Sequence, residues 1–451
     1  MSAEKADVLK FGRLAPPIRS RVLEVAVWGF ILVSVGRIGE VIPGLSVLPL
    51  AKIMLGLSVI ALMTKWSSLP AVGVTSLSLF KTIMVLAALV LVSVPFSIWP
   101  GQSVVFLYQQ FPVLILTVVL ICKLSYEWTS VRNLLLVLVV SGALLAVPAL
   151  QGYSGGRARV DSMYDTNDLA YILVTIFPLA LGFFLVARSK SKRLLALAVT
   201  VALVATILLT SSRGGFLALI AATTLILIDN GKFELDRGPG AASVHTRRRK
   251  GRLSKVMLAV FVCACLSAVV WPMLPDQHQQ RILSVLNLES DYNLDPENDK
   301  GRLQIWQRGA DALVARPFGY GVNASLMVDL RFGGRMMAPH SSLMEVGVEL
   351  GVLGAYLFLQ TYALAYFGLG RARRRLQMQG DGSDGELKRE QSVFFRMLQA
   401  SLVGNLIAGL FLTLAYATIL WAIVAIAMGC LSLSPAAAKG KAVRVKTGVN
   451  K

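Results

Sequence analysis

Long apolar runs alternate with short polar segments along most of the chain, and this pattern predicts helices that cross a membrane. A helix needs about 20 apolar residues to cross the roughly 30 Å of hydrocarbon in a bilayer. Backbone groups in lipid must be paired within their own segment, so such runs have to be helical. We expect twelve spans, near residues 22–37, 46–63, 76–97, 103–122, 131–149, 168–187, 194–210, 214–229, 255–274, 341–369, 394–411 and 413–433.

Composition supports an all-α, polytopic membrane protein. Hydrophobic residues make up 55% of the chain and charged residues only 16%, whereas a soluble protein carries about 25% charged residues. The polar, basic N-terminus lacks the apolar core of a cleaved signal, so we expect the first span to be an uncleaved anchor. The expected segments are a cytoplasmic N-terminus at 1–21, transmembrane helices 1–9 at 22–274, a long periplasmic loop with short helices at 275–340, transmembrane helices 10–12 at 341–433 and a basic cytoplasmic tail at 434–451.

Basic residues set the expected orientation. They cluster in loops 187–193, 229–255 and 370–396 and in the C-terminal tail, which share one side if twelve spans follow an N-terminus on that side. Such clusters mark the cytoplasmic side, so both termini are expected there. The net charge of +20 is therefore mostly a topology signal. Nucleic-acid binding is a competing interpretation of the arginine runs, but no folded domain accompanies them, and we expect no nucleic-acid partner.

The sequence does not favour a dedicated metal site. Its cysteines all lie inside or at the edges of apolar runs, as small hydrophobic residues do: Cys122, Cys263, Cys265 and Cys430. There is no Asp-x-Asp motif at an outer helix start and no His, Cys or Asp cluster at ligand spacing. Asp161, Asp165 and Asp168 nevertheless leave a metal site open.

The long loop contains one predicted amphipathic helix at 302–315. Its spacing places Leu303, Trp306, Ala310 and Leu313 on one face. The helix is expected to end at Arg316-Pro317 and, since both ends of the loop enter the membrane, to lie near the bilayer surface.

Three expected spans, beginning near 168, 214 and 341, start on the outer side and present their free N–H groups there, where anions bind favourably. Asp165 to Asp168 can cap the first, and Arg157 and Arg159 precede it. A capped helix with interfacial arginines explains this segment equally well.

The second start combines Ser212, Arg213 and Gly214 in a very short turn. The arginine lies at a helix N-terminus, where a cation is unfavourable unless an anion is bound. The alternative is an arginine that reaches the bilayer interface without a ligand.

The third start places His340 before Ser342 and Glu345, which match a capping box. The helix dipole and partial burial should both favour a neutral imidazole, the form needed in a base or a hydrogen-bond acceptor. A capping or packing histidine is the alternative. Taken together, the arginines, the glycine turn and the helix starts favour a phosphate or diphosphate ligand.

Five motifs between about Arg159 and Phe358 carry a family resemblance. They are Arg…Tyr-Asp-x-Asn-Asp-Leu-Ala (Arg159, Tyr164, Asp165, Asn167), Ser-Arg-Gly-Gly (Ser212–Gly215), Gly-Arg-x-x-x-Trp (Arg302, Trp306), Pro-x-Gly-x-Gly (Pro317, Gly319, Gly321) and His-x-Ser-x-x-Glu-x-x-x-Glu-x-Gly-x-x-Gly (His340, Ser342, Glu345, Glu349, Gly351, Gly354). Their order and spacing resemble the bacterial O-antigen ligase and O-antigen polymerase superfamily.

The resemblance implies a GT-C-like, inverting glycosyltransferase of the bacterial inner membrane, working at the periplasmic face without cofactor or metal. The donor would be a glycan on undecaprenyl diphosphate, and the acceptor a glycan such as lipid A–core. The implied roles are diphosphate binding by Arg213 and Arg302 with Arg159, Ser212 and Gly214, acceptor activation by His340, and support by Asn167, Asp165, Trp306 and Glu345. A polymerase with a lipid-linked acceptor and a polysaccharide transporter without chemistry are the alternatives.

Overall fold

The computed structural model describes residues 20–41, 45, 47–66, 73–153, 156–160, 164–228, 301–378 and 385–433, together with 272, 275, 276, 279 and 280. Apart from an isolated bridge between Val160 and Tyr164, regular structure in this part of the chain is helical. The elements are α2 (Arg21–Ser34), α3 (Ile38–Val41), α4 (Leu50–Lys65), η1 (Gly73–Ser76), α5 (Ser78–Ser93), η2 (Val94–Phe96), α6 (Pro100–Gln109), α7 (Phe111–Leu124), α8 (Trp128–Gln151), α9 (Thr166–Val186), α10 (Lys190–Leu209), α11 (Arg213–Ile228), α14 (Arg302–Ala315), α15 (Ser325–Arg331), α16 (Ser342–Met378), α17 (Gly385–Gly409) and α18 (Thr418–Ser432).

These helices confirm a polytopic, all-helical membrane protein. Within the described ranges, six helical segments are long and apolar enough to cross a bilayer: Ser78–Phe96, Pro100–Leu124, Trp128–Gln151, Thr166–Val186, Lys190–Leu209 and Ser342–Met378. Shorter apolar helices add Arg213–Ile228 and Thr418–Ser432. The expected span at 255–274 lies almost wholly outside the described residues. The expected short helices of the long loop are α14 and α15.

Polar contacts bring the starts of α8, α10 and α17 and the end of α16 together at one end of the bundle. Glu390 of α17 forms an ion pair with Arg132 of α8, at 3.1 Å. Arg188, just before α10, pairs with Glu386, and Gln377 Nε2 donates to Ser392 Oγ at 3.1 Å. We call this the basic end, since the arginines of loops 187–193 and 370–396 lie there.

The starts of α9, α11 and α16 meet at the opposite end, which we call the site end. The starts of α11 and α16 contact the loop 410–417 between α17 and α18. Ser342 Oγ, at the start of α16, donates to the Leu412 carbonyl at 2.8 Å. A β-carbon added at Gly214 of α11 would lie 3.1 Å from Phe411. Helices that start at one end and finish at the other fit the alternation expected of successive spans.

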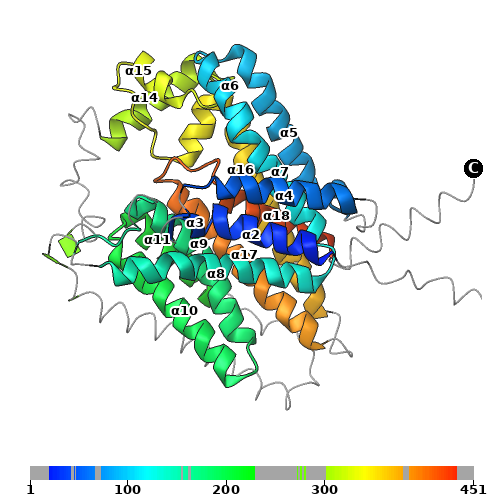
Figure 1. Ribbon diagram of the computed structural model, residues 1–451. Coiled ribbons are helices and arrows are strands. Elements are labelled where there is room, and N and C mark those ends of the chain that lie inside the picture. The colour runs from blue at the N-terminus through cyan, green and yellow to red at the C-terminus, as the bar shows by residue number, and fades with distance from the viewer. Residues whose placement is uncertain are drawn as a thin grey trace, which may run out of the picture.

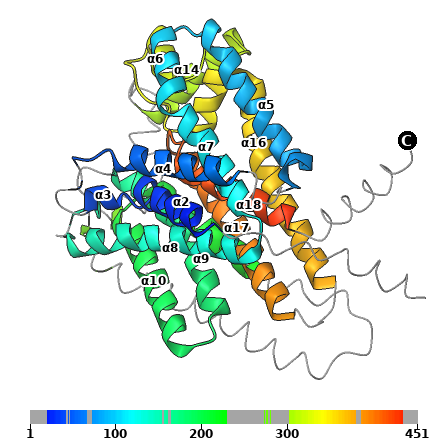
Figure 2. The same ribbon diagram turned by 45° about the vertical axis from the view of Figure 1, so that its right-hand side comes forward.

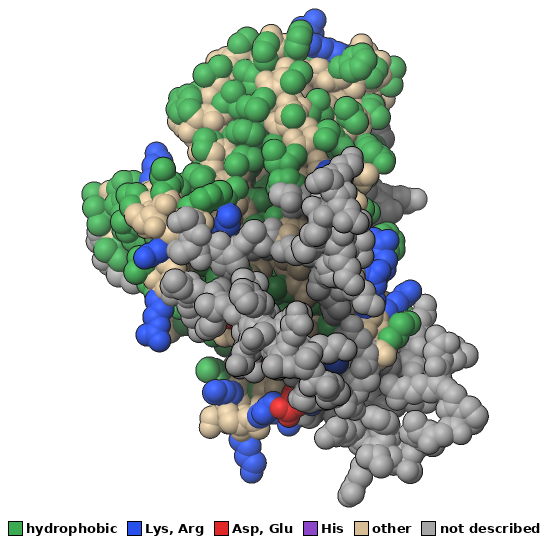
Figure 3. Space-filling view, turned by 90° about the vertical axis from the view of Figure 1, so that its right-hand side faces the viewer, with side chains coloured by type: hydrophobic (Ala, Val, Ile, Leu, Met, Phe, Trp, Pro, Cys, Tyr) green, Lys and Arg blue, Asp and Glu red, His purple; other side chains and the backbone are tan. Residues whose placement is uncertain are grey.

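α9 is the central helix, and all but a few of its residues are buried. It packs against α8, α10, α11 and α17. Figures 1 and 2 show α5, α6 and α14 together at the top of the molecule and α10 at the bottom. On the face in Figure 3, hydrophobic side chains cover the upper region, and Lys and Arg side chains lie mainly below it. This distribution suits a surface in contact with lipid above a basic rim.

The fourth expected span, 103–122, lies within the candidate span Pro100–Leu124. This span is interrupted at Gln110, which separates α6 from α7. Pro112 explains the break, because a proline lacks the N–H that would continue the helix and its ring clashes with the carbonyl four residues earlier.

The tenth expected span is also interrupted, at Gly351 of α16, where φ is 75° and ψ is −174°. The segment Pro317–Gly321 docks in this break through backbone hydrogen bonds. Val352 N donates to Pro317 O at 2.9 Å, Tyr320 N to Val348 O at 2.9 Å and Gly321 N to Glu349 O at 2.8 Å. The expected motifs Pro-x-Gly-x-Gly and Glu-x-Gly are thus the two sides of one backbone contact.

Gly351→Ala is expected to destabilise the protein strongly. A β-carbon there would lie 2.2 Å from Pro317 O, and the backbone strain alone costs about 1–3 kcal/mol. Thermal unfolding in detergent measures the effect. Gly56→Ala in α4, where no atom lies within 4 Å of the added carbon, is the matched control and should be neutral or stabilising. Equal unfolding temperatures in the two variants would contradict the assignment.

Candidate functional site

The start of α9 is built by Asp165 and Asn167, as expected from the sequence. Asp165 caps the helix, since its Oδ1 accepts from Thr166 N at 2.6 Å. Asn167 Nδ2 donates to Asp165 Oδ2 at 3.0 Å, and Asn167 Oδ1 accepts from Arg157 at 3.1 Å. Arg157 Nε also donates to Thr210 O at 2.8 Å, which ties this segment to the turn before α11. Arg157 thus bridges the two helix starts, while the side chain of Arg159 is exposed.

The turn between α10 and α11 presents Arg213 at the first position of a helix. Ser211 has a left-handed backbone with φ 52°, which reverses the chain sharply. Ser212 is the cap, because its Oγ accepts from Gly215 N at 3.3 Å and its carbonyl from Phe216 N at 2.9 Å. Arg213 is therefore the first residue of a capped helix start and is half-buried. Its neighbour Gly214 packs closely against Phe411 of loop 410–417.

Helix α14 begins with Arg302 and ends where the sequence predicted, at Ala315. The face that α14 buries against the protein lies about one position from the expected apolar face: Leu303 and Ala310 are exposed, and the buried residues are Ile305, Arg308, Gly309 and Ala312. The close contact of Gly309 with Met344 of α16 explains the rotation, since it brings α14 tightly onto that helix. Trp306, which stays half-buried, donates from Nε1 to Pro339 O at 2.8 Å.

The peptide bond between Pro339 and His340 is held by two hydrogen bonds. The preceding carbonyl accepts from Trp306, and the His340 N–H donates to Thr413 Oγ1 at 2.9 Å. Its φ of 46° is uncommon for a residue other than glycine, and strained backbones of this kind cluster at functional sites.

The expected capping box at Ser342 and Glu345 is wrong. Ser341 caps α16, because its Oγ accepts from Met344 N at 3.4 Å. Ser342 Oγ accepts from Leu414 N at 3.0 Å, and Glu345 Oε2 accepts from Ala415 N at 3.0 Å. Both side chains are buried and form hydrogen bonds with the backbone of loop 410–417. These tertiary contacts replace the local capping box that the sequence indicated.

Electrostatics link the three segments into one site. Burial lowers the pKa of His340 and the positive charge of Arg302 lowers it further, while Asp165 opposes the shift. Burial alone would raise the pKa of Asp165, but hydrogen bonds from Thr166 and Asn167 and the charge of Arg157 outweigh it and lower the pKa. The neutral imidazole expected from the sequence is thereby supported, with Arg302 as a cause that the sequence did not reveal.

The structure brings His340, whose pKa is lowered, near half-buried Arg302 and the N-termini of α9 and α16. Such a site can bind an anionic group and, next to it, accept a proton from a hydroxyl.

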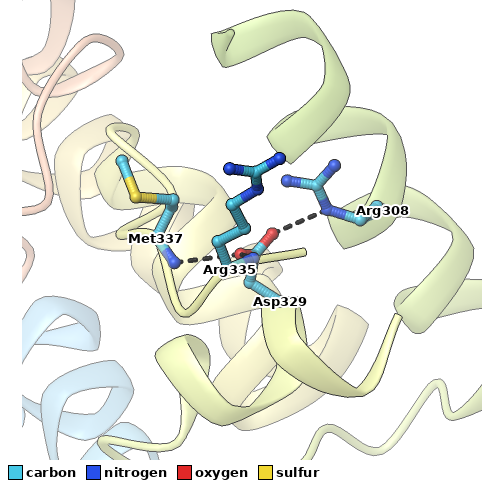
Figure 4. A network of polar contacts seen from close by, with 4 residues as sticks. All are labelled: Arg308, Asp329, Arg335 and Met337. Atoms are coloured by element: carbon cyan, nitrogen blue, oxygen red, sulfur yellow. Dashed lines mark hydrogen bonds and ion pairs between the residues drawn. The ribbon is translucent and has the colours of Figure 1, made fainter. Parts of the chain in front are cut away.

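Three residues that shape this end were not identified from the sequence. Arg308, on the polar face predicted for α14, is buried and pairs with Asp329 at 2.7 Å (Figure 4). Asp329 had no recognisable signal. The guanidinium of Arg37 lies 4.2 Å from the ring centre of Tyr164, a contact across more than a hundred residues that only the fold reveals.

Cys122 and Cys430 are buried free cysteines, which confirms their expected role as small hydrophobic residues. Cys263, Cys265 and Asp161 lie outside the described residues. Within the described part of the chain, His, Cys, Asp and Glu side chains form no group of three or more that could hold a metal ion.

Comparison with known proteins identifies the middle of the chain. No curated protein matches it. The family model described as O-antigen ligase matches residues 198–359, a range that contains Arg213, Arg302, Trp306 and His340. Residues 198–359 therefore form an O-antigen ligase domain, the domain of an enzyme family of glycosyltransferase type.

Proposed function

We propose that this protein is a GT-C-like, inverting glycosyltransferase that moves a glycan from undecaprenyl diphosphate to an acceptor such as lipid A–core, without metal or cofactor. The observation that carries the proposal is the placement of His340 near Arg302, where burial and the charge of that arginine both lower the pKa of the histidine. A transporter has no need of this combination. The family match supports transfer of lipid-linked glycans as the general activity.

In the proposed reaction, the oxygen of the acceptor hydroxyl attacks the anomeric carbon of the donor glycan. The bond from that carbon to the diphosphate breaks, and undecaprenyl diphosphate leaves with the electron pair. His340 takes the hydroxyl proton. Arg213 and Arg302 neutralise the charge that develops on the diphosphate, assisted by Ser212, Gly214 and Arg159.

The remaining residues orient these groups. Asn167 and Asp165 hold Arg157 at the start of α9. Trp306 fixes the carbonyl before His340, and Glu345 holds loop 410–417, whose Thr413 accepts from His340 N.

The surface glycan of a deletion strain tests this proposal. Loss of attached glycan with retention of lipid-linked polymer is the result expected of a ligase. Acceptors capped with a single repeat would instead indicate a polymerase. An unchanged glycan profile, or loss of export without loss of transfer in isolated membranes, would overturn the enzymatic proposal in favour of no role or of transport.

We further propose twelve spans in the bacterial inner membrane, with the site end in the periplasm and both termini in the cytoplasm. Reporter fusions after Lys250 and after Arg375 are expected to read cytoplasmic, and a fusion at Asn293 periplasmic. The basic clusters motivate this orientation. A periplasmic signal at Lys250 would move the site to the wrong side for a periplasmic donor.

A further inference from the structure

The chain that leads into His340 wraps around one buried carboxylate. We call residues 333–339, between α15 and His340, the strap. Its backbone binds Asp329, the residue near the end of α15: Arg335 N donates to Oδ2 at 3.0 Å and Met337 N to the same oxygen at 2.9 Å. Gly334 N donates to the Asp329 carbonyl at 2.8 Å. Figure 4 shows the strap folded over this carboxylate.

Arg308 of α14 holds the other oxygen of Asp329, with Nε donating to Oδ1 at 2.7 Å. Both side chains are buried, at 9% and 5% exposed. A buried ion pair of this kind contributes little net stability compared with apolar residues, but breaking one partner is strongly unfavourable. The main effect of this ion pair is therefore to fix the position of the Asp329 carboxylate and of the backbone N–H groups that bind it.

The same helix α14 contacts the far end of the strap and also carries an arginine of the site. Trp306 donates to Pro339 O, and Arg302 lies one turn earlier, where its charge acts on His340. Thus α14 contacts the strap directly at Pro339 and indirectly through Asp329, while it also carries Arg302.

We propose that Asp329, held by Arg308, is a positioning residue that fixes the strap and, through it, the place of His340 relative to Arg302. The inference rests on the proposed function, in which His340 receives the acceptor proton. It assigns a role to a side chain that lies outside the reacting groups and acts only through the backbone of the strap.

Two variants test the role in the full-length protein in detergent or liposomes. Asp329→Asn replaces one acceptor oxygen by an amide that repels the facing N–H groups. Gly334→Ala keeps both charges of the pair but would place a β-carbon 2.2 Å from Asp329 Oδ2 and 2.3 Å from Oδ1, which pushes the strap away from the carboxylate. Asp311→Asn, on the exposed face of α14, is the matched control.

Each strap variant is expected to lower glycan transfer by about 10²-fold, the loss typical of a misplacement near 1 Å. Binding of undecaprenyl diphosphate to the folded protein should match that of Asp311→Asn, whereas the unfolding temperature should fall, because the buried pair is broken in one variant and crowded in the other. The acid limb of the pH profile should move to higher pH. A displaced imidazole is less buried and farther from Arg302, and these are the two causes that lower the pKa of His340. Asp165 acts in the opposite direction, so weakening the other two raises the pKa. A purely structural role would not move that limb.

Three outcomes would count against the inference. Transfer at the control rate in both variants would show that the strap does not position His340. Loss of donor binding together with unfolding would show that Asp329 only stabilises the fold. Normal glycan transfer by His340→Ala would contradict the proposed function itself, on which this inference rests. A slow His340→Ala beside normal Asp329→Asn and Gly334→Ala contradicts the positioning role alone.

Discussion

Alanine at Arg213 or at Arg302 is expected to abolish glycan transfer, a loss of about 10³-fold or more, while the protein remains folded and inserted. Each residue is the first of its helix, α11 or α14, where a cation is unfavourable unless it meets an anion. Removing either should therefore leave stability unchanged or improved while the diphosphate loses its partner. Radiolabelled glycan transfer in proteoliposomes gives the rate, and thermal unfolding gives the stability.

Lysine variants and a remote arginine sharpen this test. Arg213→Lys and Arg302→Lys should restore activity only in part, because an ammonium lacks the planar fork that binds two phosphate oxygens. Arg331→Ala, an exposed arginine at the end of α15, is the control and should transfer at the rate of the unaltered protein. Near-normal activity in Arg213→Ala would mean that this arginine only reaches the membrane interface.

His340→Ala is expected to slow the chemical step by roughly 10²–10⁴-fold, the usual contribution of a general base. Donor binding should change little, since the arginines hold the diphosphate. His340→Gln keeps hydrogen bonding but cannot take up a proton, so it separates orientation from base catalysis. Full activity in the glutamine variant would leave only an orienting role, and loss of donor binding in the alanine variant would place His340 among the diphosphate ligands.

The pH dependence of transfer follows from the lowered pKa of His340. A base is active when unprotonated, and a lowered pKa keeps the imidazole unprotonated down to a more acidic pH. Activity should therefore be retained through neutral pH and fall only below the ordinary histidine pKa of about 6.5. This acid limb should be absent from the residual activity of His340→Gln. An acid limb above that value would contradict the assignment.

The helix starts of the site were predictable because their signals are local. Asp165 and Ser212 cap α9 and α11 as their positions indicated, and the end of α14 follows from Arg316-Pro317. The charge pattern also predicted which helix ends share a side, and the basic end agrees with it.

The parts that could not be predicted depend on contacts distant in sequence. Nothing near Glu345 indicates that loop 410–417 needs its carboxylate, so the local capping pattern was misleading. The buried face of α14 is set by Gly309 on Met344, and Arg308 is buried only because Asp329 meets it there. The bridge formed by Arg157 was also unpredictable, because the Thr210 carbonyl that it binds belongs to a turn fifty-three residues away.

The break at Gly351 bears on how this protein can be recombined with its relatives. From sequence alone, a chimera would be joined at the start of α16, and the loop before it would be exchanged as one unit. Because Pro317–Gly321 forms backbone hydrogen bonds with Val348, Glu349 and Val352, a unit ending near residue 340 would separate two halves of one structure. A chimera should instead carry the loop and the first three turns of α16 from the same parent, so that inheritance of acceptor preference can be followed in a protein that still folds.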